Sequence, residues 1–240
     1  MTITYIYHSC YLLEFDEFSV IFDFYKDAKK DDGRFWVKDY LLEKEDDLYV
    51  FCTHSHSDHF NPQILEWRKK KTNITYVFST EVLENKRLKE DNIVYLDKLQ
   101  TYEDALLHVK AFGSTDEGGS FLMKVGDKNY FHAGDLNNWH WNEEVPKHEA
   151  ATYENNYLCE LELVAENVEN VFVAMFPVDP RLGKDYMRGA EQFVKRIPTR
   201  YFLPLHFGEH YAKANAFSPF AQKHQCDYLN INKKGQSFEL

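Results

Sequence analysis

The chain has 240 residues, 44% of them hydrophobic and 16% aromatic, which is typical of a globular protein and excludes a disordered one. Its 28 Lys and Arg against 39 Asp and Glu give a net charge of −11. This charge disfavours extended nucleic-acid binding but allows a small anion bound to a metal, so we expect a small-molecule substrate and no nucleic-acid partner. The length suits a single domain over residues 1–240. Composition does not determine whether the protein is a monomer or an oligomer.

The cysteines and the first residues indicate a cytoplasmic protein. The four cysteines are far apart and form no C-x-x-C pair, as expected for reduced thiols: Cys10, Cys52, Cys159 and Cys226. Residues 1–7 are typical of a short strand and lack the basic region of a secretory signal. No apolar run approaches the roughly 20 residues of a membrane span, so we expect no membrane partner.

The first part of the chain is expected to form strands. Apolar alternation predicts strands over residues 3–7, 11–15 and 19–24. A charged loop and a short helix within residues 39–47 are expected next. The apolar run 48–52 then predicts a buried strand.

Three histidines and an aspartate follow this strand within six residues: His54, His56, Asp58 and His59. Their loop begins at the carboxyl end of a strand, where open α/β sheets bind ligands. His54 and His56 are two residues apart, so in an extended segment they point the same way. Imidazole and carboxylate groups suit zinc, iron or manganese. A merely histidine-rich polar loop is the alternative, but four potential ligands in this order favour a metal site.

Strands and helices alternate in the rest of the chain. Asn61 and Pro62 are a typical cap and first residue for a helix over residues 62–70. Strands are predicted at 74–79, 93–96, 106–112, 119–125, 129–132, 171–176 and 201–205. Helices are predicted at 81–89, at 147–167, around 186–197 and near the C-terminal end. This order predicts an α/β layered domain.

Two later strand ends carry further ligand-type residues. Gly134 follows the strand 129–132 and allows a sharp turn that aims Asp135, for which helix capping is the weaker alternative. His132 precedes this turn and is expected to bond to a ligand or a carbonyl group. His206 follows the strand 201–205.

The run His54-x-His56-x-Asp58-His59 resembles the signature of the metallo-β-lactamase superfamily of metal-dependent hydrolases. The resemblance implies an αββα four-layer sandwich. It also implies that Asp135 is the carboxylate that bridges two metal ions and that His206 is the last metal-binding histidine.

The pattern is closest to the lactonase-like branch of that superfamily. In that branch, a His-Ser pair like His8-Ser9 and an aspartate like Asp23 lie near the metal. For Asp23, a loop-bracing hydrogen bond to backbone N–H groups is the favoured interpretation. For His8, a role at the site and a structural role are equally open.

The chain departs from the superfamily pattern at its third histidine. Residues 111–119 contain no histidine; Ser114 or Thr115 stands at the expected place, and Asp116 is close. The first metal position would then consist of His54 and His56 with Asp135 or Asp116. The second keeps its full set: Asp58, His59, Asp135 and His206. Three protein ligands plus water form a normal catalytic zinc site, so we expect one or two Zn²⁺ ions, with Mn²⁺ or Fe as alternatives.

Residues after two of the strand ends are candidates for contact with the substrate. Trp139 and His140 are predicted to line the pocket, although covering the core is the commoner use of aromatic side chains. Asp179 and Arg181 either pair with each other, or Arg181 receives an anionic group of the substrate.

The predicted function is hydrolysis of a small ester, lactone or phosphodiester by a metal-activated water. The resemblance implies that Asp58 is catalytic, orienting the nucleophile and taking its proton. A metal- or ligand-binding protein with a single metal and impaired catalysis is the second hypothesis. Redox chemistry at iron ranks last, because redox members usually replace a histidine of the first motif with an acidic residue and here that motif is intact.

Overall fold

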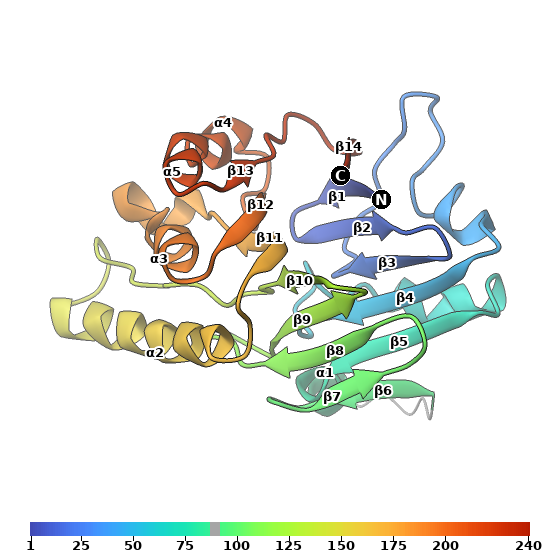
Figure 1. Ribbon diagram of the computed structural model, residues 1–240, viewed down its shortest axis with the longest axis horizontal. Helices are drawn as coiled ribbons and strands as arrows, with labels where there is room; N and C mark the ends of the chain where they lie inside the picture. Colours follow the sequence, from blue (N-terminus) through green and yellow to red (C-terminus); the bar gives the residue numbers. More distant parts are fainter. Residues whose placement is uncertain (87–91) are drawn as a thin grey trace. The chain divides into compact units, whose positions relative to one another are not determined.

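A computed structural model describes residues 1–86 and 92–240 (Figure 1). The chain divides into two compact units. The first unit contains Met1–Leu96 and Ile231–Leu240, and the second contains Asp97–Asn230. Each unit is built on one seven-stranded sheet. That residues 1–240 form a single domain stays a prediction.

The sheet of the first unit is mixed, with parallel strands at its centre. In spatial order its strands are β14 (Gln236–Glu239), β1 (Thr2–Tyr7), β2 (Cys10–Glu14), β3 (Phe18–Phe22), β4 (Asp47–Cys52), β5 (Ile74–Ser79) and β6 (Ile93–Leu96). Strands β3 to β6 are parallel, and the other pairs are antiparallel. The carboxyl ends of β3, β4 and β5 therefore lie at one edge of the sheet, which positions the loops that follow them.

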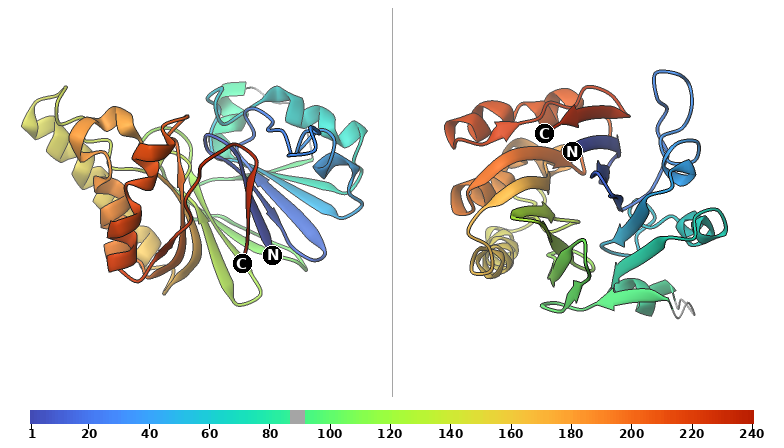
Figure 2. Two further views of the ribbon diagram at one scale, coloured as in Figure 1. Left: turned by 90° about the horizontal axis from the view of Figure 1, so that it is seen from above. Right: turned by 45° about the vertical axis from the view of Figure 1, so that its right-hand side comes forward.

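Short helices cover one face of this sheet: η1 (Leu41–Glu43), η2 (Pro62–Lys69) and α1 (Thr80–Lys86) (Figure 2). Asn61 caps η2 as predicted, because its side chain accepts a hydrogen bond from the N–H of Gln63. The segment is a 3₁₀ helix throughout, which the cap alone could not indicate. Of the helix predicted at 81–89, residues 87–89 lie outside the described residues.

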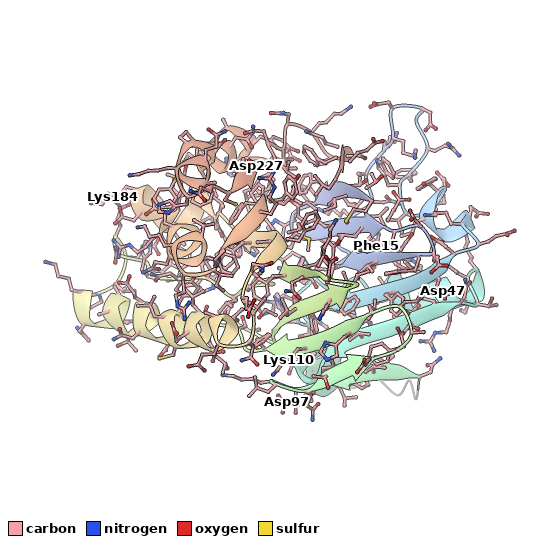
Figure 3. All side chains as sticks on the ribbon, viewed as in Figure 1. Phe15, Asp47, Asp97, Lys110, Lys184 and Asp227 are labelled. Atoms are coloured by element: carbon pink, nitrogen blue, oxygen red, sulfur yellow. The ribbon has the colours of Figure 1, made fainter. Side chains whose placement is uncertain are left out.

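The amino-terminal ends of the strands in this sheet are also anchored. The side-chain N–H of Asn73, just before β5, donates to the carboxylate of Asp47 at the start of β4 (3.0 Å). Asp47 and Phe15 are labelled in Figure 3. Phe15, in the turn after β2, stacks on Phe18 with ring centroids 4.6 Å apart. These contacts hold the turns opposite the histidine loop.

The sheet of the second unit is also mixed. In spatial order its strands are β13 (Asp227–Tyr228), β12 (Thr199–Leu205), β11 (Val171–Pro177), β10 (Lys128–His132), β9 (Ser120–Val125), β8 (His108–Phe112) and β7 (Thr101–Glu103). Strands β10 to β13 are parallel, whereas β7 to β10 form antiparallel pairs. The polar three-residue strand β7 was not predicted, because it lacks an apolar alternation.

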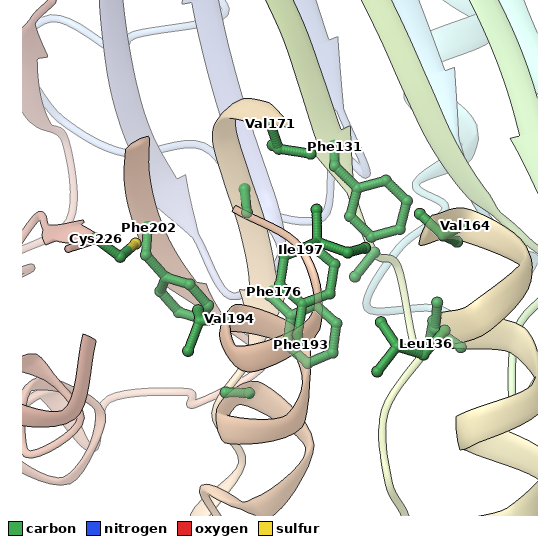
Figure 4. Close-up of a cluster of buried hydrophobic side chains, with 14 of the residues drawn as sticks. Phe131, Leu136, Val164, Val171, Phe176, Phe193, Val194, Ile197, Phe202 and Cys226 are labelled. Carbon is green, nitrogen blue, oxygen red and sulfur yellow. The ribbon is translucent and has the colours of Figure 1, made fainter. Parts of the chain in front are cut away.

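Helices and an aromatic core stabilise the second sheet. Its helices are α2 (Lys147–Ala165), η3 (Pro180–Asp185), α3 (Arg188–Arg196), α4 (Tyr211–Asn215) and α5 (Ser218–Lys223). Phe193 of α3 stacks on Phe131 of β10 and contacts Phe176 of β11 at a tilt, with centroid distances of 5.5 and 4.7 Å (Figure 4). Within residues 1–86 and 92–240, no helix has both the length and the apolar character needed to cross a bilayer.

Candidate metal centre

The loop after β4 brings the ligand-type residues of the first unit together. His54 and His59 are buried, whereas His56 is exposed. The ligand atoms of His8, Asp58 and His59 all lie within 4.8 Å of one another, and those of His54 and His56 form a second such group. The six-residue motif therefore divides into two ligand sets, and His8 joins the set that contains Asp58 and His59.

Asp23 orients His59. Oδ2 of Asp23 lies 2.8 Å from Nδ1 of His59. The same carboxylate accepts hydrogen bonds from the backbone N–H (2.8 Å) and the hydroxyl (2.7 Å) of Thr53. Asp23 thus braces the loop, as the sequence favoured. It also contacts a ligand-type histidine directly, as outer carboxylates do at metal sites. The resemblance implied a position near the metal for Asp23 but did not indicate His59 as its partner.

Glu81 holds the middle of the loop. The N–H and hydroxyl of Ser55 donate to the two carboxylate oxygens of Glu81, at 2.7 and 2.6 Å. Glu81 lies in the first turn of α1, which follows β5. Because β4 and β5 are parallel, α1 begins at the same sheet edge as the histidine loop. Sequence analysis missed Glu81, and the only signal was an acidic residue at the start of a predicted helix.

His8 contacts the carboxylate of Asp58. Nε2 of His8 lies 3.3 Å from Oδ2 of Asp58. The hydrogen bond from His8 outweighs the partial burial of Asp58 and holds the pKa of this carboxyl well below its usual range. His8 adopts a left-handed backbone conformation (φ 57°), which is strained for a residue other than glycine. Asp58 is consequently ionised at neutral pH.

In the second unit, His206 lies between two carboxylates. Its Nδ1 is 2.9 Å from Oδ2 of Asp179, and its Nε2 is 3.4 Å from Oδ1 of Asp135. Burial lowers the pKa of His206, but these two carboxylates outweigh it and raise that pKa to about 10. The parallel strands β10, β11 and β12 end at one sheet edge, which brings the residues that follow them together.

Asp179 and Arg181 pair with each other, as one of the two alternatives predicted. The other alternative, that Arg181 receives an anionic group of the substrate, stays a prediction. Nε of Arg181 lies 2.8 Å from Oδ2 of Asp179. Burial raises the pKa of Asp179, but hydrogen bonds from His206 and Arg181 lower it to about 2. Asp179 is therefore a carboxylate at neutral pH and accepts the bond from Nδ1 of His206.

The two units repeat one arrangement, a carboxylate bonded to Nδ1 of a histidine. The pairs are Asp23–His59 and Asp179–His206. In both, the bond at Nδ1 would leave Nε2 as the nitrogen that binds a metal, as is usual for histidines at metal sites. Asp23 (φ 46°) and His206 (φ 62°) both have left-handed backbones, a strain typical of functional sites.

A cavity of about 290 Å³ lies beside Asp135 in the second unit. It is lined by Thr115, Asp116, Asp135, Trp139, Trp141, Tyr153, Arg181 and His206. Trp139 stacks on Trp141 with centroids 6.2 Å apart and donates from Nε1 to the carbonyl oxygen of Asp135 (2.8 Å). Trp139 and Asp116 therefore line a cavity with two of the predicted ligands.

Two other predicted site histidines bond to nearby backbone. Nε2 of His140 lies 3.1 Å from the carbonyl oxygen of Asp185, and burial lowers the pKa of His140. His140 is absent from the residues that line the cavity beside Asp135. Nδ1 of His132 accepts a hydrogen bond from the N–H of Gly134 (3.2 Å), inside the turn that carries Asp135. His132 thus supports this turn.

The segment 111–119, which lacks the third histidine, is hydrogen-bonded to the loop that contains Asp135. The hydroxyl of Thr115 donates to the carbonyl oxygen of Asn137 (2.6 Å) and accepts from its N–H (3.0 Å). The N–H of Asp116 donates to the hydroxyl of Ser114 (3.3 Å). Thr115 thus supports the backbone, while Asp116 presents the ligand-type side chain of this segment.

Comparison with known proteins identifies the family. Residues 2–150 match the family model described as the beta-lactamase superfamily domain. No curated protein sequence matches the chain. The structure is similar to Igni18, a metallo hydrolase from Ignicoccus hospitalis, with a TM-score of 0.70 and 17% identity over 100% of this chain and 98% of that one.

Two further structures have the same fold. CmlA, a diiron beta-hydroxylase from Streptomyces venezuelae, has a TM-score of 0.70 and 14% identity over 100% of this chain and 54% of that one. An isothiocyanate hydrolase from Delia radicum gut bacteria has a TM-score of 0.60 and 13% identity over 100% and 99% of the two chains. These similarities confirm the predicted α/β sandwich of the metallo-β-lactamase type.

Proposed function

Because the chain belongs to the beta-lactamase superfamily, we propose that it is a metal-dependent hydrolase of a small ester, lactone or phosphodiester. The observation that carries this proposal is the repeated carboxylate–histidine pair. Asp23 orients His59 in the first unit, and Asp179 orients His206 in the second. The His8–Asp58 contact supports placement in the lactonase-like branch.

The donor set fits a divalent metal of borderline hardness. We propose that one or two ions, Zn²⁺ with Mn²⁺ or Fe as alternatives, bind to His54, His56, Asp58, His59, Asp135 and His206. When bound, such an ion lowers the pKa of a water molecule, so that hydroxide forms near neutral pH. Within each unit, the bonds at Nδ1 of His59 and His206 make Nε2 the atom that would bind it.

Asp58 orients the nucleophile in this proposal. It is ionised at neutral pH, and His8 restrains its carboxylate. Because the pKa of Asp58 lies far below neutrality, it is a weak base and is better suited to accept a hydrogen bond from the nucleophile than to retain its proton. The stacked rings of Trp139 and Trp141 would contact an apolar part of the substrate.

Metal content and hydrolysis test this proposal together. The protein, purified without chelator, should contain one or two metal ions and hydrolyse a member of a lactone, carboxylic ester and phosphodiester panel. Asp135→Ala should lose bound metal and turnover. His148→Ala, a change of an exposed histidine in α2, is the matched control and should retain both. A protein without stoichiometric metal would refute the proposal.

A metal-binding protein without catalysis is the second candidate. It is favoured by the segment 113–119, which lacks a histidine and in which the hydroxyl of Thr115 is bonded to the backbone of Asn137. One firmly bound metal with no turnover on any ester, lactone or phosphodiester would support this candidate. Turnover that disappears in Asp135→Ala would exclude it.

We also propose that the protein acts in the reducing cytoplasm. All four cysteines are free, and three of them are buried. Burial raises the pKa values of the Cys10 and Cys52 thiols well above their usual range, which makes them unreactive. Subcellular fractionation of the native organism tests this location.

A further inference from the structure

The first unit contains a cavity of its own, of about 810 Å³, between η2 and the loop after β3. We propose that this cavity binds a small amphiphilic anion, with its apolar tail on an aromatic floor and its carboxylate at a lysine rim. The volume lies within the range usual for small-molecule sites. The residues that line it include none of the proposed metal ligands, so this site is additional to the metal centre.

The floor of the cavity is apolar and well packed. Phe24 and Trp67 meet edge to face with ring centroids 4.9 Å apart. Val37 and Leu42 lie beside them, and all four side chains belong to the hydrophobic core of the first unit. Because the core holds these side chains, an apolar tail would meet a preformed surface and would not have to order one.

The rim carries positive charge. Lys26, Lys38, Lys69 and Lys70 all line the cavity and are exposed. Lys69 pairs with Glu66, and the ammonium group of Lys26 lies 4.4 Å from the centre of the Tyr25 ring. Among the described residues, Lys38 and Lys70 have no carboxylate within ion-pair distance. On a chain with a net charge of −11, such a cluster favours an anionic head group.

The carboxylate of Asp27 also lines the cavity and is held by backbone N–H groups. It accepts hydrogen bonds from the backbone N–H groups of Ala28 (2.8 Å), Val37 (3.0 Å) and Lys38 (2.9 Å). These bonds fix the loop that forms one wall of the cavity. The four lysines of the rim outnumber the two carboxylates of the lining, Asp27 and Glu66, so the lining favours an anion.

Two segments that line the cavity continue directly from residues of the metal centre: Asn61 follows the histidine loop, and Phe24 and Tyr25 follow Asp23. Asn61 lines the cavity and comes two residues after His59. The N–H of Asn61 donates to the carbonyl oxygen of Phe24 (3.0 Å), and its side-chain N–H donates to that of Tyr25 (2.9 Å). These segments fix one wall independently of a bound metal, so we expect the site to bind its ligand with or without metal.

Titration calorimetry with three ligands of one chain length tests the proposal: decanoate, decanol and decyltrimethylammonium, all below their micellar concentrations. Decanoate should bind at least about tenfold more tightly than the other two. A Lys38→Glu/Lys70→Glu variant should lose at least about tenfold in decanoate affinity. A Lys124→Glu/Lys128→Glu variant, with the same change of charge on exposed residues of the second unit, should bind like the native protein.

Chelator separates this site from the metal centre, since a carboxylate could also coordinate a metal. Decanoate binding should persist in EDTA and should change the fluorescence of Trp67, an effect absent in Trp67→Phe. Binding that vanishes in EDTA, or that is equal for decanoate and decanol, would overturn the assignment. So would association with phosphatidylglycerol vesicles that is stronger than decanoate binding, because it would indicate a membrane surface.

Discussion

Nδ1 of His59 lies 2.8 Å from Oδ2 of Asp23, a residue 36 positions earlier in the chain. Both residues follow parallel strands whose carboxyl ends meet at one sheet edge. The buried carboxylate selects the tautomer of His59 that carries its proton on Nδ1. This bond is therefore the link between the fold of the first unit and the chemistry of the histidine loop.

We predict that Asp23→Asn lowers metal affinity by about 10- to 100-fold, because an amide does not hold the Nδ1 proton of His59 as a carboxylate does. Competition with a chelating dye measures the affinity, and the Co²⁺ absorption spectrum reports the ligand geometry. Asp16→Asn, in an exposed turn, is the control and should change neither quantity. An unchanged Co²⁺ spectrum in Asp23→Asn would show that this bond does not orient a metal ligand.

Glu81→Gln should lower metal affinity by about tenfold. The two bonds from Ser55 to Glu81 hold the backbone between His54 and His56, and a neutral amide accepts them more weakly. Glu84→Gln changes an exposed glutamate of the same helix and should bind metal normally. If both variants bind metal equally well, the hydrogen bonds between Ser55 and Glu81 have no role at the metal centre.

Gly189→Ala should destabilise the protein by about 1–3 kcal/mol, although alanine is the better helix former. A Cβ atom at Gly189 would lie 2.0 Å from Oδ1 of Asn137 and 2.9 Å from the backbone N of Asn138. Chemical denaturation measures the free energy of unfolding. Gly126→Asn, at a hairpin position with φ 59° and open space, should be nearly neutral. Equal stability of the two variants would contradict the predicted clash.

The side chain of Asp46 should make stability depend on pH. Burial raises its pKa, but hydrogen bonds from Ser19 and Lys44 and the nearby charge of Lys71 lower it below the ordinary 3.8. A lowered folded-state pKa gives stability that is fully present above the unfolded-state pKa and lost as pH falls through the folded one. We predict that Asp46→Asn costs about 1–3 kcal/mol at pH 7.

This cost should shrink as the pH falls below about 4, where the native carboxylate also becomes protonated. Urea denaturation of both proteins at a series of pH values measures it. Asp127→Asn, a change in an exposed hairpin, should show no such cost at any pH. A cost for Asp46→Asn that stays constant down to pH 2 would show that the charge of this residue does not stabilise the fold.

The sequence by itself determined the features that depend on neighbouring residues. Apolar alternation located the main strands, and the amphipathic pattern located α2. The histidine motif could be identified because its residues lie within six positions of one another. The prediction of a metallo-β-lactamase fold, which the family match confirms, depended on this local motif and on the order of the elements.

Only the tertiary structure decided which distant residues support the ligands. Ser55 meets Glu81, and His206 meets Asp179, across 26 and 27 positions of sequence. These pairs depend on which strands are parallel neighbours and on their register, which local periodicity does not contain. Charged side chains such as those of Glu81 and Asp179 occur mostly on protein surfaces, so only their placement at the sheet edge gives them their roles.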